Sequence, residues 1–222
     1  MIRLVKRPKN DINSVEGIRI GENYKVYGDY ALFWHQNAGK TVISMLDGDM
    51  IISGDPDDYE ELSAFVNMIS PRSVFSSSAI LEGLGILDNA LIVSVLSRKG
   101  GQTVPDISDE LSSKEVYALL KTTGFTFPDH SHFATDYCLR LNKGRLNYFA
   151  IKDAAVSMCI GKKNVLINGM VSLKKGYGSK CLNGLLSKVR PEKAFVCAKR
   201  DVEAFYIKNG FIKEYEAGYW RK

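Results

Sequence analysis

The sequence predicts an α/β (α+β) protein with two halves, each containing a mixed, mostly antiparallel sheet flanked by helices. Three observations favour this fold class. Short β-prone runs separated by tight polar turns occur in groups of three, an amphipathic helical run follows each group, and a proline then precedes a buried strand. The chain has 222 residues, enough for one large domain or two small ones. We expect two, at residues 1–127 and 128–222.

The first half begins with an antiparallel meander whose strands are joined by polar turns. The helix that follows carries apolar side chains on one face, and the last helix of this half opens with the capping box Ser112-x-x-Glu115. The expected elements are the strands Tyr30–His35, Thr41–Leu46 and Asp49–Ser53, the helix Asp57–Ile69, the strand Ser73–Ser76, a short helix ending near Gly85, the strand Ala90–Leu96 and the helix Ser112–Lys121.

The second half repeats this order after a turn at Pro128–Ser131. A helix that ends before Gly144 precedes three β-prone runs, and a basic, glycine-containing turn then opens an amphipathic helix. The expected elements are the helix Phe133–Asn142, the strands Tyr148–Lys152, Ala155–Ile160 and Val165–Val171, a helix after Gly178, the strand Ala194–Cys197, the helix Asp201–Lys208 and the strand Phe211–Tyr219. Met50–Gly85 therefore parallels Val165–Gly210, which indicates a divergent internal duplication.

Charge divides the halves. Residues 1–111 carry 10 Lys and Arg against 16 Asp and Glu, whereas residues 112–222 carry 20 against 9. Only the second half is therefore suited to an anionic ligand. An arginine-rich run and an aromatic RNA-binding motif are both lacking, so we expect a phosphorylated small molecule and no nucleic acid.

The cysteines and the hydropathy pattern predict a cytoplasmic protein that binds no membrane and no metal. The sequence shows no charged-then-apolar leader and no apolar run of membrane-spanning length. The histidines and cysteines have no metal-ligand spacing, so we expect buried thiols in a reducing compartment. The four cysteines are Cys138, Cys159, Cys181 and Cys197.

The turn in LKKGYGSKCLNGLL (residues 173–186) predicts a phosphate site. A helix N-terminus offers unpaired backbone N–H groups and favours negative charge, and glycine lets a phosphate approach closely. The residues that would form the site are Gly176, Gly178, Ser179, Lys174, Lys175 and Lys180. The matching turn of the first half, GDPDDYEE, is acidic and would repel phosphate. The simpler alternative is a flexible turn with solvated lysines.

Two segments resemble the acyl-CoA-binding half of the GNAT acetyltransferase superfamily. They are VLINGMVSLKKGYGSKCLNGLL (residues 165–186) and AFVCAKRDVEAFYIKNGF (residues 194–211). Gly176 and Gly178 match the two small positions of the family's Q/R-x-x-G-x-G/A loop, and Phe205–Phe211 (FYIKNGF) matches a closing phrase of the form FYxKxGF. The resemblance covers residues 131–222 and implies that the first half is a degenerate copy, as in two-lobed members.

The sequence departs from the family pattern at three places. Leu173 stands at the position that is normally Gln or Arg, and the link from the strand to the glycine loop is short. Lys199 stands where Asn is common.

The resemblance implies an enzyme that moves an acetyl group from acetyl-CoA to an amine of a small molecule or peptide by direct transfer. The thioester arm would lie along Ile167–Val171, a backbone N–H near Met170 or Val171 would polarise the carbonyl, and Tyr206 would protonate the leaving thiolate. The implied acetyl-CoA site comprises Gly169, Met170, Val171, Lys174, Lys175, Gly176, Tyr177, Gly178, Ser179, Lys180, Lys199 and Phe205. Without the motif, Tyr206 would be interpreted as a core aromatic.

The general base stays open. Some members place a Glu where this sequence has Asn168, whose amide cannot take a proton. The candidate bases are therefore His130, His132, Asp136, Asp153 or a water molecule. Two other functions also remain: a non-catalytic CoA-binding module, and an aminoacyl transferase of the two-lobed cell-wall type. The acceptor is not encoded in any readable pattern, and we expect a monomer or a homodimer.

Overall fold

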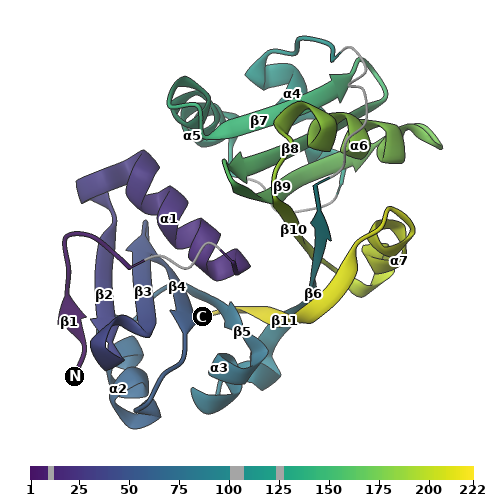
Figure 1. Ribbon diagram of the computed structural model, residues 1–222. Helices are drawn as coiled ribbons and strands as arrows, with labels where there is room; N and C mark the ends of the chain where they lie inside the picture. The colour runs from purple at the N-terminus through teal and green to yellow at the C-terminus, as the bar shows by residue number, and fades with distance from the viewer. Residues whose placement is uncertain (10–12, 101–107, 124–127) are drawn as a thin grey trace. The chain divides into compact units, whose positions relative to one another are not determined.

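The computed structural model describes residues 1–9, 13–100, 108–123 and 128–222 (Figure 1). Within these residues the chain forms two units. One comprises Met1–Ser97 together with Cys197–Lys222, and the other comprises Arg98–Val196. Each unit contains strands, helices and buried hydrophobic side chains.

The first unit contains a mixed sheet with one parallel strand pair. Its strands are β1 (Arg3–Leu4), β2 (Leu32–Gln36), β3 (Thr41–Leu46), β4 (Asp49–Gly54), β5 (Ser73–Ser77), β6 (Ala90–Lys99) and β11 (Ile212–Arg221). β1 to β4 form successive antiparallel pairs. β4 is parallel to β5, and the sheet continues antiparallel from β5 through β11 to β6. The expected meander is confirmed.

Four α-helices belong to the described part of the first unit: α1 (Val15–Tyr27), α2 (Tyr59–Ile69), α3 (Ser78–Gly83) and α7 (Arg200–Lys208). Phe33 of β2 packs edge-on against Tyr24 of α1, and the next residue, Trp34, packs against Phe65 of α2. Because successive side chains of a strand point to opposite faces, α1 and α2 cover opposite faces of the sheet. One-turn 3₁₀ helices span Gly28–Tyr30, Asn37–Gly39 and Leu87–Asn89.

The second unit also combines antiparallel and parallel strands. Its strands are β7 (Leu146–Ile151), β8 (Ala155–Gly161), β9 (Asn164–Ser172) and β10 (Lys193–Ala198), and its helices are α4 (Ser113–Lys121), α5 (His130–Asn142) and α6 (Tyr177–Val189). β7, β8 and β9 are antiparallel, and β10 is parallel to β9. The described strands are therefore mixed and mostly antiparallel, with flanking helices, as expected.

Close packing fixes α6 on this sheet. A Cβ at Gly184 would lie 2.6 Å from the Phe149 ring, so the helix can approach β7 this closely only with glycine there. The thiol of Cys181 donates to the Phe149 carbonyl at 3.0 Å, and Leu182 and Leu185 are fully buried. The helical face predicted from the sequence is thus the packed face.

Strand β1 was not expected, and two helices also differ from the sequence-based expectation. α1 was not expected, because its buried residues include Glu16, Gly17, Gly21 and Glu22, which hide the apolar period. α5 begins at His130, not Phe133, because the Asp129 side chain accepts a hydrogen bond from the His132 N–H at 3.0 Å and caps the helix there. The capping box of Ser112 and Glu115 is confirmed at the start of α4.

The two units contain the same run of elements, β2–β3–β4–α2–β5 and β7–β8–β9–α6–β10. α2 and α6 end alike, at Ser70 (φ 53°) and Arg190 (φ 50°), each followed by proline. The N–H of each bonds the carbonyl four residues earlier at 2.8 Å. β11 pairs with β5 and β6, so the segment Cys197–Lys222 belongs to the first unit. Lobes divided at residues 127 and 128 therefore remain a proposal about the origin of the chain.

Candidate functional site

The start of α6 is the feature around which the candidate site is built. Gly176 caps this helix in the left-handed conformation (φ 87°, ψ −24°), and no side chain caps it. A Cβ at Gly176 would meet nothing within 4 Å, so the backbone there faces open space. By position, the N–H groups of Gly178 and Ser179 have no partner within the helix. The turn therefore presents uncapped amide hydrogens to a ligand.

The turn before this helix is held by its own backbone. The Leu173 N–H bonds the Ala154 carbonyl at 2.8 Å, which fixes the end of β9 to the β7–β8 turn. The Lys174 carbonyl accepts bonds from the Ser172 hydroxyl at 2.8 Å and from the Tyr177 N–H at 3.3 Å. The short link noted in the sequence is thus an ordered connection.

Positive charge surrounds the uncapped turn. Lys174, Lys175 and Lys180 are exposed, and the first turn of α6 contains no acidic residue. Within the described residues, neither Lys174 nor Lys175 forms an ion pair. Uncapped amides, a helix dipole and nearby ammonium groups together favour an anion.

β9 is irregular next to this turn. Met158 of β8 is paired with Gly169, whereas Cys159 is paired with Ile167, so Asn168 is an extra residue in β9. The parallel pairs of β10 with β9 end at Ile167, so residues 169–172 pair only with β8 among the described strands of this unit. A bulge bends a strand and re-aims its side chains. No sequence pattern revealed this bulge.

The sequence-predicted site residues fall into two groups. The group in the second unit lines the end of β9 and the start of α6: Gly169, Met170, Val171, Lys174, Lys175, Gly176, Tyr177, Gly178, Ser179 and Lys180. Lys199, Phe205 and Tyr206 lie on or beside α7, in the first unit. Gly178 is buried, Ser179 is half-buried and Gly176 is exposed.

Tyr206 is 8% exposed, and its ring packs edge-on against Phe205 and Phe211. Burial, with a smaller effect of Cys197, raises the pKa of Tyr206 to about 12. The phenol therefore stays protonated and can donate a hydrogen bond. Proton transfer to a thiolate of ordinary pKa, about 8.5, is uphill, which makes Tyr206 a weaker acid than an unperturbed tyrosine.

Three of the four cysteines are poor nucleophiles, and the fourth, Cys138, is exposed, so the expectation of a buried thiol is wrong there. Burial raises the pKa of Cys159, Cys181 and Cys197 to about 12 in each case, which disfavours the reactive thiolate. Among the described residues, no group of His, Cys, Asp and Glu side chains could hold a metal ion. No helix among them is long and apolar enough to cross a membrane.

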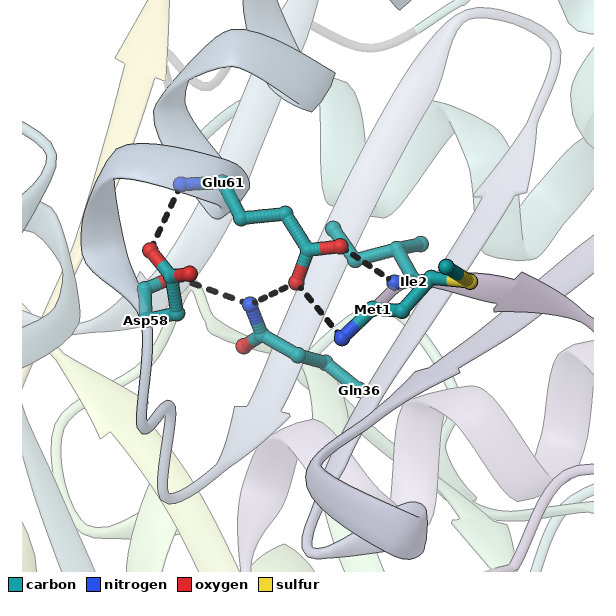
Figure 2. Close-up of polar contacts among 5 residues, drawn as sticks. All are labelled: Met1, Ile2, Gln36, Asp58 and Glu61. Carbon is teal, nitrogen blue, oxygen red and sulfur yellow. Dashed lines mark hydrogen bonds and ion pairs between the residues drawn. The ribbon is translucent and has the colours of Figure 1, made fainter.

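The corresponding helix start in the first unit is closed (Figure 2). The Asp58 side chain caps α2 by accepting a bond from the Glu61 N–H at 2.8 Å. The amide of Gln36, fully buried, donates to the Asp58 carbonyl at 2.8 Å and to Glu61 Oε2 at 2.9 Å. The other oxygen of Glu61 accepts the Ile2 N–H at 2.7 Å, and the Met1 amino group lies 3.1 Å from Oε2. Carboxylates thus occupy the place where α6 offers open amides.

No protein-family model matches the chain, and no curated protein matches it either. Solved structures do match. A GCN5-related N-acetyltransferase from Kribbella flavida gives a TM-score of 0.56 at 10% identity, covering 81% of this chain and 85% of that one. A GCN5-related N-acetyltransferase from Sphaerobacter thermophilus gives 0.56 at 11% identity, covering 88% and 81%.

A third structure, from Pyrococcus horikoshii, covers all of this chain and 89% of its own at a TM-score of 0.56 and 8% identity. Identities this low indicate a shared fold and no more. The matches agree with the motif resemblance in the second half. The chain has the fold of the GCN5-related N-acetyltransferases, the GNAT fold.

Proposed function

We propose that this protein is an acyltransferase that moves an acetyl group from acetyl-CoA to an amine of a small molecule or peptide. The uncapped, lysine-flanked start of α6 carries the proposal. It combines open amides, a left-handed glycine and positive charge in one turn. The GNAT fold makes this turn the place expected for the pyrophosphate of CoA.

In this proposal the pyrophosphate accepts hydrogen bonds from the backbone N–H groups of Gly178 and Ser179. Lys174 and Lys175 neutralise its charge. The pantetheine arm runs along residues 168–172 of β9, beyond the last parallel pair, and adds to the sheet edge there. The strand places backbone amides where the thioester carbonyl oxygen would gain negative charge.

The reaction is a direct transfer. The neutral amine attacks the thioester carbonyl, the carbon–sulfur bond breaks, and the thiolate leaves. Tyr206 protonates the thiolate. The excess proton on the new amide nitrogen passes to water, and the solvent returns a proton to the tyrosine. The buried phenol is a weak acid, so its main effect is a hydrogen bond to the departing sulfur.

The test joins a binding measurement to a thiol-release assay. Titration calorimetry should detect acetyl-CoA and CoA binding, and free thiol should appear with at least one amine of a panel. Lys174→Glu combined with Lys175→Glu should weaken acetyl-CoA binding about a hundredfold, because two charge-assisted contacts become repulsive. Lys162→Glu, an exposed lysine elsewhere in the same unit, is the matched control. Equal affinity of all three proteins would refute the phosphate site.

A non-catalytic CoA-binding module is the second candidate. Two observations favour it: the pKa of Tyr206 is about 12, and the exposed residue of the bulge is the amide Asn168 where some GNAT proteins have a carboxylate. Tight CoA binding without thiol release on any amine would support this alternative.

A further inference from the structure

A second cluster of charged and aromatic side chains lies in the first unit, where α1 meets β5 and β11. Arg19 Nη1 donates to the Tyr219 hydroxyl at 2.9 Å. The guanidinium carbon lies 4.5 Å from the centre of the Phe75 ring and 5.3 Å from that of Tyr219. The two rings are themselves 4.4 Å apart on adjacent strands. The arginine is therefore held in one position by stacking and by a hydrogen bond.

Part of the Arg19 guanidinium remains available. The bond to Tyr219 is its one hydrogen bond to a described residue, and no Arg19 atom is among the buried polar atoms that lack a partner. None of its nitrogens is therefore both fully buried and without a partner, and the residue is half-buried. A guanidinium has five N–H donors in a planar fork, which matches a carboxylate or phosphate.

No contacting carboxylate neutralises Arg19 among the described residues. Glu16, one turn earlier on α1 and 3% exposed, accepts the Tyr215 hydroxyl at 2.5 Å and forms no ion pair with Arg19. Burial opposes the charge of Arg19, yet Tyr219, Cys197 and Glu16 hold its pKa above the ordinary value. The site therefore keeps a permanent cation that an external anion would neutralise.

The cluster adjoins the tyrosine of the proposed reaction. Cys197 is an electrostatic neighbour of both Tyr219 and Tyr206. These three residues and Arg19 all belong to the first unit. Arg19 thus lies two side chains away from the proposed acid.

We propose that Arg19 binds an oxyanion, a carboxylate or a phosphate, carried by the amine acceptor. The inference rests on the proposed function for the identity of the ligand. Stacking on Phe75 and the bond to Tyr219 pre-organise the fork, so little side-chain freedom is lost when the anion binds. The acceptor class is then a small amine with an acidic group.

The activity test compares amines that differ only in their acidic group. One pair is an α-amino acid and its decarboxylated amine, and the other is phosphoethanolamine and ethanolamine. The wild type should favour the acidic member of at least one pair, which identifies carboxylate or phosphate. Arg19→Met should lower kcat/KM for that member roughly tenfold to a hundredfold and leave the neutral member within about twofold. Arg19→Lys should recover part of the loss.

A binding test needs no acyl transfer. Thermal unfolding of the wild type is followed in sodium phosphate and in sodium succinate against sodium chloride of equal ionic strength. One of the two oxyanions should raise Tm. Part of this rise should persist in the Lys174→Glu, Lys175→Glu double variant, and Arg19→Met should abolish that part. Arg3→Met, an exposed arginine of the same unit, is the matched control.

The outcomes separate the two proposals. CoA binding and thiol release without any preference for acidic amines would overturn the Arg19 site alone. Absence of CoA binding would end the proposed function, whereas an Arg19-dependent shift in Tm would still support the oxyanion site. Arg19→Met could instead lower Tm in chloride and leave both the preference for acidic amines and the oxyanion-induced rise in Tm unchanged. In that case Arg19 only stabilises the fold and the inference is wrong.

Discussion

The starts of α2 and α6 occupy the same place in the element order of the two units but have opposite chemistry. Asp58 caps α2, and Glu60 and Glu61 lie in its first turn. Gly176 opens α6 without a side-chain cap, and the turn is basic. One βαβ arrangement therefore yields either a closed helix start or an anion site. The residues of the turn decide the chemistry, and the topology decides only where it is presented.

The strands that precede α2 and α6 also differ, in their regularity and in what occupies their backbone groups. β3 and β4 pair in continuous register from Thr41 to Leu46, whereas β9 contains the Asn168 bulge. The parallel pairs of β4 with β5 also end early, at Ile51, but there the buried hydroxyl of Ser76 donates to the Ile52 carbonyl at 2.8 Å. A side chain thus occupies a backbone acceptor next to the parting strands of the first unit. A ligand arm would have to displace it.

Exchanging the cap chemistry should give the largest effect. Gly176→Asp places an acceptor and a negative charge beside the open amides, as Asp58 does in α2. We expect acetyl-CoA affinity, measured by calorimetry, to fall about a hundredfold or more, because charge repulsion adds to loss of the amide contacts.

Gly176→Asn is the control for this change. It has the same size and the same cost of about 1 kcal/mol for a left-handed residue, without the charge. The asparagine Oδ1 can accept the same amide hydrogens, so this variant should lose some affinity but clearly less than Gly176→Asp. Equal loss in both variants would mean that capping or backbone strain, not charge, explains the result.

The helices α3 and α7 offer a second contrast. Counted from the glycines that follow them, Tyr206 of α7 corresponds to Leu81 of α3, so α3 has no hydroxyl at this position. Tyr206→Phe should lower kcat roughly tenfold to a hundredfold, at the low end for a general acid. Tyr30→Phe, at an 88% exposed tyrosine, should have no effect.

The pH profile sharpens the same prediction. Burial favours the protonated phenol and raises the pKa of Tyr206 to about 12. The ratio of wild-type to Tyr206→Phe kcat should therefore stay constant between about pH 6 and about pH 10. A ratio that falls with an inflection near the ordinary tyrosine pKa would show that Tyr206 titrates normally and is not in this buried environment.

Removing the side-chain cap of α2 should have a smaller effect, on stability only, and should create no second acetyl-CoA site. Asp58→Ala removes the α2 cap and should lower the free energy of unfolding by about 1 kcal/mol. This variant keeps Glu60, Glu61 and the hydrogen bond from the Ser76 hydroxyl to the Ile52 carbonyl. Calorimetry should therefore still give one acetyl-CoA per chain. Asp57→Ala, next to the cap, should leave stability unchanged in urea unfolding. A second equivalent of acetyl-CoA bound by the Asp58→Ala variant would contradict the comparison.

The smallest effect concerns acid. The hydrogen bond from Gln36, with the Ile2 N–H, lowers the pKa of Glu61 below its ordinary value of 4.5. A lowered pKa in the folded state stabilises the fold above the unfolded value and loses this effect as pH falls through the folded pKa. Glu61→Gln should therefore destabilise the protein at neutral pH, and its difference from wild type in urea unfolding should shrink at low pH. Glu60→Gln should match the wild type throughout.

Sequence patterns predicted most strands and helices because the meander strands and the α2 and α6 faces have regular apolar periods. They failed for α1, where Glu16 and Glu22 are buried beside two glycines. They also could not place Asn168 in a bulge, since strand register depends on pairing between β8 and β9. The glycine turn was predictable because its chemistry is local.

Arg19 escaped prediction for a related reason. Its partners, Phe75 and Tyr219, are distant in sequence and meet only when β5 and β11 pair. A lone arginine in an unexpected helix gives no pattern. The return of β11 to the first unit likewise depends on long-range pairing.

Backbone details of the two units support the proposed duplication. In the first unit the Arg72 N–H bonds the Gly48 carbonyl, and in the second the Glu192 N–H bonds the Lys163 carbonyl, each at 2.8 Å. Both bonds join the strand after the proline to the preceding meander turn. Divergence after duplication would explain why one turn is capped and acidic and the other open and basic.

Backbone amide NMR during an acetyl-CoA titration tests the central claim most directly, because it follows both helix starts in one sample. The account predicts large, saturable shifts of the amides at residues 176–180 and none at residues 58–62. Shifts of the α2 amides, or unmoved α6 amides while the cofactor binds elsewhere, would contradict it.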